Sequence, residues 1–216
     1  MQCKICKGEV VHFFDNYMDA DTYHCKACAF MFKDHNAIIS TEKELKVYEQ
    51  HNNSEENLGY VAMFQEFIDK TFAPYEENIT EVLEFGSGPT PVLASLLKKR
   101  DLEVDIYDKF YAPEKVYEGK KYDLITSTEV IEHIAEVEEL FVFFAEHLKH
   151  NGYLALMTQF HTNDAEHYLK WWYRRDPTHI CFYHPHTFEV LAEKFGFKLL
   201  FCDDKKNVLL QKDSYL

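Results

Sequence analysis

Residues 81–91, Glu-Val-Leu-Glu-Phe-Gly-Ser-Gly-Pro-Thr-Pro, are the stretch that decides the fold. The first five residues predict a strand, and the turn Gly86-Ser87-Gly88 lets the backbone approach a ligand closely. Thr90 then offers an N-cap hydroxyl and Pro91 has the φ of a first helical residue, so a helix is expected through Leu97. A strand, a glycine turn and a helix in this order predict the first unit of a doubly wound α/β domain.

The chain after Ile79 continues to alternate strands and helices, which predicts a parallel sheet with helices on both faces. Near the C-terminus, Gly196 is expected to end a helix, and the two apolar segments after it are expected to pair as an antiparallel hairpin. The expected strands cover 81–85, 104–107, 122–126, 153–157, 197–201 and 208–211, and the expected helices cover 129–135, a longer segment through 147, and 187 to 196.

Asp108 stands at the end of the second expected strand, 22 residues after Gly86. An acid in that place accepts hydrogen bonds from ribose hydroxyls, so this order of elements predicts a site for an adenosine cofactor. A dinucleotide normally needs a third small residue three positions after the second glycine, so that helix and strand close over a pyrophosphate. Pro91 occupies that position after Gly88, and the turn therefore disfavours NAD.

Four of the six cysteines fall in the first 28 residues, in two pairs with eighteen residues between them. Each pair has two intervening residues, which points both thiolates at one ion, and the segment between the pairs is long enough for a short hairpin. The alternative is a pair of disulfides, which are rare in a reducing compartment. The spacing predicts a zinc ribbon over residues 1–40, with structural zinc on Cys3, Cys6, Cys25 and Cys28. The substitute ligands that this region offers, His12, His24 and His35, are expected at the surface.

Residues 41–78 are expected to form a helical linker between the ribbon and a domain over residues 79–216. Thr41 and Glu44 have the spacing of a capping box, which predicts a helix start. The acidic and amide-rich segment from Gln50 to Asn57 predicts a loop between two helices, either a solvated linker or a mobile loop near the active site. The second helix is indicated by apolar residues at three-to-four spacing, which are Leu58, Val61, Phe64, Ile68 and Phe72.

The composition is that of a globular chain, with 46% hydrophobic and 28% charged residues. The net charge is −14, from 37 acidic and 23 basic residues, and such an excess of acids repels phosphate backbones. Nucleic acid is therefore not expected as a substrate. No segment reaches eighteen uninterrupted apolar residues and the N-terminus lacks a signal-peptide pattern, so a cytoplasmic protein without a membrane segment is expected.

Three segments together resemble the motifs of class I S-adenosylmethionine-dependent methyltransferases, particularly small bacterial ones that carry an N-terminal zinc ribbon. They are residues 82–88, 104–108 and 122–133, and the resemblance covers residues 79–216. It implies a seven-stranded sheet whose last strand is antiparallel. It also implies the contacts of S-adenosylmethionine: the methionine part on Glu84, Gly86 and Gly88, the ribose on Asp108, and the amino-acid end on the backbone of Ser127 and Thr128.

The chain departs from that family between the second and the third of these segments. Only thirteen residues separate Asp108 from Tyr122, where the family fits a strand, a helix and an acid that contacts adenine. The third strand is therefore expected to be shortened or missing. Adenine is expected to pack on one of four residues, Phe110, Tyr111, Val116 or Tyr117, with Glu118 as a candidate acceptor for its exocyclic amine.

Aromatic, basic and histidine residues concentrate in segments 158–161 and 171–184, and both tryptophans of the chain stand there. Because these segments follow a strand and lie beyond the carboxyl edge of the sheet, they are interpreted as an acceptor pocket. The two arginines, Arg174 and Arg175, could hold a carboxylate or phosphate of the acceptor. The alternative is that they pair with Asp176 while the aromatic residues cap the core.

The catalytic candidates are His179 first and His161 second, each as a general base or as the group that orients the acceptor. Imidazole titrates near neutrality, so it can accept a proton as the methyl moves and needs little adjustment of its pKa. Asp176 stands three residues before His179 and could fix its tautomer. The remaining cysteines, Cys181 and Cys202, are expected to be buried thiols that take no part in the reaction.

Two functions from different classes are consistent with these patterns. The leading hypothesis is methyl transfer to a small-molecule acceptor at O, N or C. The alternative is a binding or assembly module, in which the ribbon docks a partner protein and the cofactor fold is catalytically silent. A histidine-rich acceptor lining favours the enzyme, because a silent scaffold has little use for one. Methylation of a protein that the ribbon grips stays open as a third hypothesis.

Overall fold

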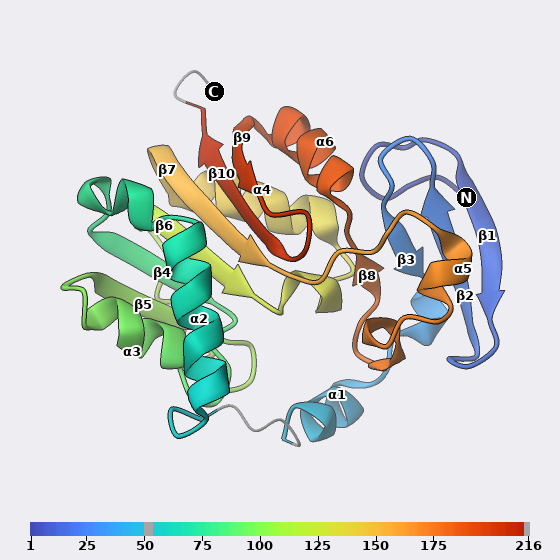
Figure 1. Ribbon diagram of the computed structural model, residues 1–216, viewed down its shortest axis with the longest axis horizontal. Helices are drawn as coiled ribbons and strands as arrows, with labels where there is room; N and C mark the ends of the chain where they lie inside the picture. Colours follow the sequence, from blue (N-terminus) through green and yellow to red (C-terminus); the bar gives the residue numbers. More distant parts are fainter. Residues whose placement is uncertain (50–53, 214–216) are drawn as a thin grey trace.

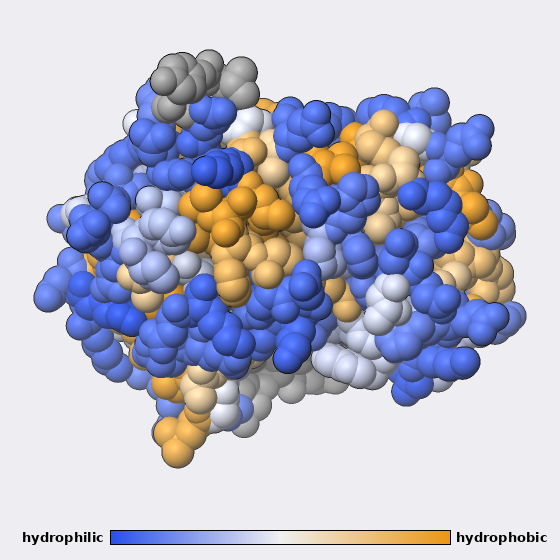
Figure 2. Space-filling model, turned by 45° about the horizontal axis from the view of Figure 1, so that its top comes forward, coloured by the Kyte–Doolittle hydropathy of each residue, from blue (hydrophilic) through white to orange (hydrophobic). Residues whose placement is uncertain are grey.

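Two β-sheets lie side by side in the computed structural model of this protein, which describes residues 1–49 and 54–213 (Figure 1). The larger sheet has six strands and the smaller has four. Hydrophilic residues cover most of the face shown in Figure 2, in keeping with the charged composition.

The larger sheet has the strand order β5-β4-β6-β7-β10-β9. The first four strands of that order are parallel, and β10 is antiparallel to both of its neighbours. The doubly wound α/β class and the terminal antiparallel hairpin are therefore confirmed. The strands are β4 (Glu81–Phe85), β5 (Glu103–Tyr107), β6 (Tyr122–Thr128), β7 (Leu148–Met157), β9 (Phe197–Cys202) and β10 (Asn207–Lys212).

This sheet has six strands where the family resemblance implied seven. Between Asp108 and Tyr122 the chain forms no strand, and Asp108 pairs with Ala112 across a tight turn, with N···O distances of 2.9 and 3.2 Å. A parallel strand needs a crossover connection of about a dozen residues or more in addition to its own length. Thirteen residues cannot supply both, so β5 is left as the edge strand.

Helices cover both faces of the sheet, and alternate strand residues divide between two apolar cores. Leu124 packs in the core beneath α2 and α3, whereas its neighbour Ile125 packs in the core beneath α4 and α6. No helix of the described residues is both long and apolar enough to cross a membrane. The helices are α1 (Thr41–Tyr48), α2 (Leu58–Lys70), α3 (Val92–Lys98), α4 (Val137–His147), α5 (Ala165–Tyr168) and α6 (Pro185–Phe195).

Three helix starts differ from those expected. The N-cap of α3 falls on Pro91 instead of Thr90, and the carboxylate of Glu84 in β4 accepts a hydrogen bond from an amide of the first turn at 2.9 Å. The N-cap of α1 is Ser40, whose side chain makes no capping bond. Residues 129–135 contain only the 3₁₀ turn Ile131–His133. A cap depends on which acceptor the tertiary structure brings to the free amides, and local sequence does not contain that information.

The linker consists of α1 and α2. The expected loop from Gln50 to Asn57 lies partly outside the described residues, and Asn57 begins α2 by accepting from the Tyr60 amide at 3.2 Å. Phe64 and Ile68 are buried in the core as expected, but Leu58 is 80% exposed. Leu58 is the first residue of α2 and precedes the part of the helix that packs on the sheet.

The N-terminal ribbon is not a self-contained unit. Its strands β1 (Val10–Asp15), β2 (Ala20–Cys25) and β3 (Met31–Lys33) form a sheet that β8 (Cys181–Phe182) completes, with Phe32 paired to Cys181. Its apolar residues belong to the same core as α4 and α6. The ribbon and the larger domain therefore stabilise one another through a shared core.

A buried ion pair also joins the ribbon to the segment 171–180. Arg174 Nη1 lies 3.0 Å from Asp15 Oδ2, and the two side chains are 4% and 1% exposed. The buried ammonium of Lys33 donates to the main-chain oxygen of Arg174 at 3.1 Å. Arg174 also donates to the main-chain oxygen of Leu169, but its ion-pair partner and the ammonium that donates to its carbonyl both come from the ribbon. The ribbon therefore helps to determine where this segment lies.

We predict that Asp15→Ala lowers the free energy of unfolding by about 3–5 kcal/mol, because it leaves the Arg174 guanidinium buried without its counter-charge. Denaturant unfolding measures the loss. The matched control is Asp21→Ala, which removes a solvent-exposed pair with His12 and should cost less than about 1 kcal/mol. Equal losses of free energy of unfolding in the two variants would show that the buried pair stabilises the protein no more than an exposed pair does.

Candidate functional site

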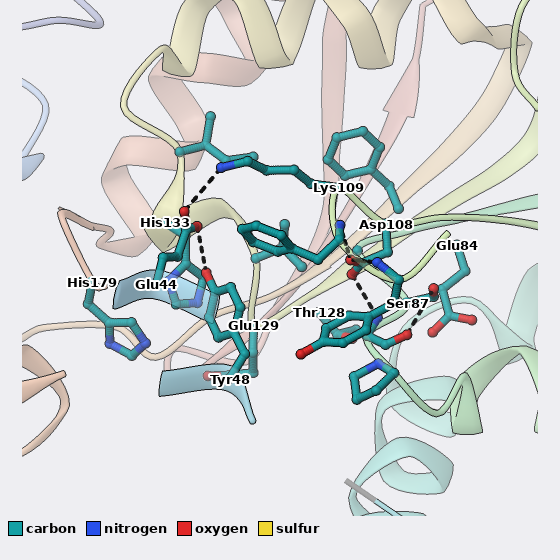
Figure 3. Close-up of a pocket in the computed structure, with 18 of the residues that line it drawn as sticks. Glu44, Tyr48, Glu84, Ser87, Asp108, Lys109, Thr128, Glu129, His133 and His179 are labelled. Atoms are coloured by element: carbon teal, nitrogen blue, oxygen red, sulfur yellow. Dashed lines mark hydrogen bonds and ion pairs between the residues drawn. The ribbon is translucent and has the colours of Figure 1, made fainter. Parts of the chain in front are cut away.

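A cavity of about 530 Å³ opens at the carboxyl ends of β4, β5 and β6 (Figure 3). Ligand sites of doubly wound sheets lie at this edge, and the volume is that of a small-molecule site. Asp108, Ser87 and Glu84 lie toward one end of the cavity in Figure 3, and His133 and His179 lie toward the other. The two ends are called the glycine-turn end and the histidine end below.

The two glycines of the turn are required for different reasons. Gly86 has a φ of 85°, and a Cβ at this position would overlap a methyl group of Val130. Gly88 has a φ of 65°, but a Cβ there would meet no atom within 4 Å. Gly86 therefore allows close packing of the loop after β6, and Gly88 leaves open space at the cavity.

Glu84 is a buried carboxyl at the glycine-turn end, with 3% of its surface exposed. One oxygen accepts the Ala94 amide hydrogen bond, and burial raises the pKa of the group to about 8. The carboxyl is therefore largely protonated at neutral pH. A cationic ligand beside it would favour the ionised form.

Asp108 uses most of its acceptor capacity within the protein. Oδ1 accepts from the amides of Phe110 and Tyr111 at 2.8 and 3.0 Å, and Oδ2 accepts from the Gly88 amide at 2.9 Å. A carboxylate offers about four lone-pair sites, so Oδ2 retains one for a hydroxyl. The same side chain thus folds the loop after β5, joins that loop to the glycine turn and presents one acceptor to the cavity.

The structure brings most of the expected cofactor residues together. Glu84, Gly86, Gly88, Asp108 and Thr128 all line the cavity, whereas Ser127 is fully buried and is not part of the described lining.

Of the adenine candidates, Phe110 and Tyr111 line the cavity. Val116 and Tyr117 instead pack against the apolar core, because the short loop after β5 turns them toward α4. Glu118 is exposed and lies 3.8 Å from Lys115, away from the described lining.

Helices α1 and α2 complete the wall of the cavity, which the sequence patterns did not predict. Glu44 on α1 accepts from the Tyr48 hydroxyl at 3.0 Å and from the Lys109 ammonium at 3.0 Å, so α1 is tied to the loop after β5. Tyr60 and Phe64 line the cavity from α2. The apolar spacing of α2 predicted that one face of the helix is buried. It did not predict that this face borders the cavity.

Two glutamates lie close together at the histidine end, where Glu132 is fully buried and Glu129 is half-buried and lines the cavity. The Tyr173 hydroxyl is 2.9 Å from Glu129 Oε2 and also contacts Glu132 Oε1. Burial raises the pKa of Glu129, and burial together with the Glu129 charge raises the pKa of Glu132 well above its usual range. Glu129 also has a left-handed φ of 53°, a strained conformation that directs its side chain into this cluster.

His179 lines the cavity, but its surroundings differ from those expected. Its Nδ1 lies 2.8 Å from the main-chain oxygen of Tyr173, whereas its Nε2 is 3.9 Å from Asp176, too far for a hydrogen bond. Thus the Tyr173 carbonyl, and not Asp176, fixes its tautomer. Burial and the neighbouring His133 lower the pKa of His179 to about 3, so the ring is neutral at pH 7 and is a weak base.

His161 does not reach the cavity as the structure describes it. Only 2% of its surface is exposed, its ring packs near His24 and His184, and its Nδ1 accepts from the Asn163 amide at 3.0 Å. Burial lowers its pKa to about 3. The structure thus places His161 apart from the described cavity lining, because the chain after β7 turns toward the ribbon.

The arginines also turn away from the cavity. Arg174 pairs with Asp15, and the Arg175 guanidinium lies 5.3 Å from the centre of the Tyr17 ring, so neither pairs with Asp176 as the alternative proposed. Among the described lining residues, Lys109 is the single lysine or arginine. The carboxyl groups of the lining are Glu44, Glu84, Asp108, Glu129 and Asp176. This balance favours a cationic ligand over a carboxylate or phosphate.

The four N-terminal cysteines converge on one point. Cys3 Sγ is 3.5 Å from Cys28 Sγ, Cys6 Sγ is 3.4 Å from Cys25 Sγ, and all four sulfurs lie within 4.8 Å of one another. A disulfide needs about 2.05 Å. A zinc tetrahedron with Zn–S of about 2.3 Å places its sulfurs about 3.8 Å apart, which this cluster fits.

The two cysteine pairs also have the same backbone turn. The Cys3 amide donates to Gly8 at 2.9 Å and the Cys25 amide donates to Phe30 at 2.8 Å, five residues on in each case. The residues after the second cysteines, Lys7 and Ala29, have φ values of 59° and 60°. Of the substitute ligands, His12 and His35 are exposed, but His24 is buried against Asn163. Cys181 is buried and Cys202 is half-buried, apart from the cluster.

Comparison with known proteins identifies the family to which the chain belongs. A family model described as a methyltransferase domain matches residues 55–200, which is more than half of the chain. No curated protein matches the sequence.

Several solved structures share the fold at low identity. A S-adenosylmethionine-dependent methyltransferase from Archaeoglobus fulgidus is 17% identical, with a TM-score of 0.56, over 78% of this chain and 99% of that one. Magnesium protoporphyrin IX methyltransferase from Synechocystis PCC 6803, with bound S-adenosylhomocysteine, is 13% identical, with a TM-score of 0.53. The match covers 80% of this chain and 94% of that one. Human N-acetylserotonin methyltransferase, in complex with S-adenosylmethionine, is 12% identical, with a TM-score of 0.57. The match covers 81% of this chain and 57% of that one. The chain spans 57–60% of the length of three similar solved structures, of which the human protein is one.

We predict that the four cysteines of the purified protein together hold one zinc ion per chain, because four thiolates complete its coordination. Metal analysis measures it. The double variant Cys25→Ser with Cys28→Ser should lose the zinc, and Cys202→Ser should keep it. Zinc retained undiminished in the double variant, or absent from the wild type, would contradict the assignment.

A second prediction concerns the glycine turn. Gly88→Ala should cost only the strain of a left-handed alanine, about 1–2 kcal/mol, because its Cβ meets open space. Gly86→Ala should cost clearly more, since the added Cβ overlaps Val130. Denaturant unfolding of both variants tests the order, and a Gly86 variant as stable as the Gly88 variant would be the contrary result.

Proposed function

The chain belongs to the class I S-adenosylmethionine-dependent methyltransferase family, and from this premise we propose that it transfers the methyl group of that cofactor to a small-molecule acceptor. The observation that supports the proposal is one continuous cavity, which joins the glycine turn to an enclosed wall of histidine, tyrosine and carboxyl groups. S-adenosylmethionine, when bound, supplies a methyl group activated by a sulfonium. The task of the chain is then to orient both reactants in line and to exclude water.

The glycine-turn end suits this cofactor. Gly88 leaves room for it, Asp108 Oδ2 can accept from a ribose hydroxyl, and Glu84 can ionise beside a cationic group. Phe110 and Tyr111 are the aromatic candidates for adenine at the same end. We keep Ser127 only as a main-chain neighbour of Thr128, because its side chain is buried in the sheet.

The histidine end suits a small acceptor. Helix α1 borders it through Tyr48, whose ring centre lies 5.4 Å from that of His133, and the Glu44–Lys109 pair ties α1 to the loop after β5. The volume of the cavity is that of a small-molecule site. The excess of carboxyl groups makes a carboxylate or phosphate acceptor unfavourable, which replaces the expectation based on the arginines. We assign His179 to orienting the acceptor through Nε2. A neutral ring with a pKa of about 3 accepts a hydrogen bond but is a poor general base at pH 7.

The ribbon has a structural part in this proposal. Four thiolates leave zinc no open position, and the ribbon holds segment 171–180 through Asp15 and Lys33. Tyr173, Asp176 and His179 lie in that segment and line the cavity. The ribbon thus positions the acceptor wall.

We expect S-adenosylmethionine and S-adenosylhomocysteine to bind and NAD not to bind, as measured by calorimetry. Asp108→Ala should weaken binding by roughly 1.5–3 kcal/mol for each charge-assisted hydrogen bond lost. Asp108→Asn separates this effect from loop folding, because its amide oxygen can still accept from the Phe110 and Tyr111 amides. Glu103→Gln, at the exposed start of β5, is the matched control. Preferential binding of NAD, or full affinity in both Asp108 variants, would overturn the assignment.

A further inference from the structure

A second group of metal-ligating side chains lies at the histidine end, apart from the four cysteines. One carboxylate oxygen of Glu132 and one ring nitrogen each of His133 and His179 lie within 4.8 Å of one another. Glu132 and His133 come from the turn after β6, and His179 comes from the segment that the ribbon positions. The rings of His133 and His179 are 4.8 Å apart between centres and lie toward the same end of the cavity in Figure 3.

Both histidines are oriented in the way that metal ligands usually are. His133 Nδ1 is 3.1 Å from the main-chain oxygen of Thr178, and His179 Nδ1 is 2.8 Å from that of Tyr173. A carbonyl can only accept, so each Nδ1 carries the proton and the lone pair of each ring is on Nε2. A ligating histidine almost always donates its other N–H to a carbonyl or carboxylate, which fixes its tautomer and ring orientation.

Glu132 offers this group a carboxyl oxygen as a ligand. Its exposed fraction is 0%, Oε1 contacts the Tyr173 hydroxyl, and Oε2 is buried without a hydrogen-bond partner. None of the ion pairs among the described residues involves Glu132. A fully buried carboxyl with one unsatisfied oxygen is costly unless it is paired or coordinates a metal.

We propose that Glu132, His133 and His179 bind a divalent transition-metal ion of the zinc type at the wall of the cavity. Two imidazole nitrogens and one carboxylate oxygen suit such ions, whereas magnesium and calcium prefer oxygen ligands throughout. Three protein ligands leave a coordination position open. This site is distinct from the four-cysteine cluster, which has no open position.

The inference rests on the proposed function and narrows the acceptor to a molecule whose hydroxyl oxygen ligates the ion. His179 Nε2 then orients this hydroxyl through the ion and not by a direct hydrogen bond. An ion bound there lowers the pKa of that hydroxyl, and its proton passes to solvent. The oxygen lone pair then forms the bond to the methyl carbon while the carbon–sulfur bond breaks and its electron pair stays on sulfur.

Cobalt(II) is the probe that tests the site. Full-length protein whose ribbon is already loaded with zinc is dialysed against Co²⁺, and bound cobalt is measured by metal analysis and visible absorption. We expect one Co²⁺ per chain without thiolate-to-cobalt charge-transfer bands. Glu132→Gln, which can keep the contact with Tyr173, and His179→Ala should each weaken Co²⁺ binding at least about tenfold. His150→Ala, an exposed histidine elsewhere on the chain, is the matched control and should bind like the wild type.

Three results would overturn the proposal: no Co²⁺ uptake by the wild type, uptake only with thiolate bands, or undiminished affinity in both Glu132→Gln and His179→Ala. Calorimetry with S-adenosylhomocysteine tests the proposed function independently of the metal site. Variants that bind it normally are folded, so their loss of cobalt reports on the metal site. A wild type that binds cobalt but not S-adenosylhomocysteine would refute the methyltransferase proposal and leave the metal site standing.

Discussion

The buried ion pair between Asp15 and Arg174 holds the junction on which the rest of the site depends. Together with the pairing of β3 and β8, it attaches the segment that carries Tyr173 and His179 to the N-terminal ribbon. Two opposite charges without water are tolerated only when they remain together, so this contact has little freedom to shift. The ribbon therefore contributes to the shape of a cavity that it does not itself line.

The electrostatics of the cavity follow from burial more than from charge pairing. Glu84 and Glu132 are buried carboxyls and Glu129 is a half-buried one, all with raised pKa values, and His179 is a buried imidazole with a lowered one. In each case desolvation disfavours the charged form. These four groups carry little charge when the cavity is empty, and the carboxyls among them ionise beside a cation. A sulfonium at one end and a metal ion at the other are the cations that the arrangement suits.

The glycine turn and the cysteine pairs were predictable because their chemistry is local. Gly86 and Gly88 were expected to allow a tight turn, and both have left-handed φ values. The thiolates of each cysteine pair are brought together by two intervening residues, whatever the rest of the chain does. The missing third strand was predictable for a similar reason, since thirteen residues set an upper limit on what can form between Asp108 and Tyr122.

Sequence by itself determined the doubly wound class, the glycine turn, the position of Asp108 and the grouping of the cysteines, because each depends on spacing along one stretch of chain. Only the tertiary structure decided which side chains face the cavity. Arg174 and His179 stand five positions apart in the same segment, yet one is turned to the ribbon and the other to the cavity. Their directions depend on Asp15 and Lys33, more than a hundred residues earlier in the chain. Contacts of that kind have no periodicity in the sequence, so no local pattern could have separated the structural arginine from the histidine of the site.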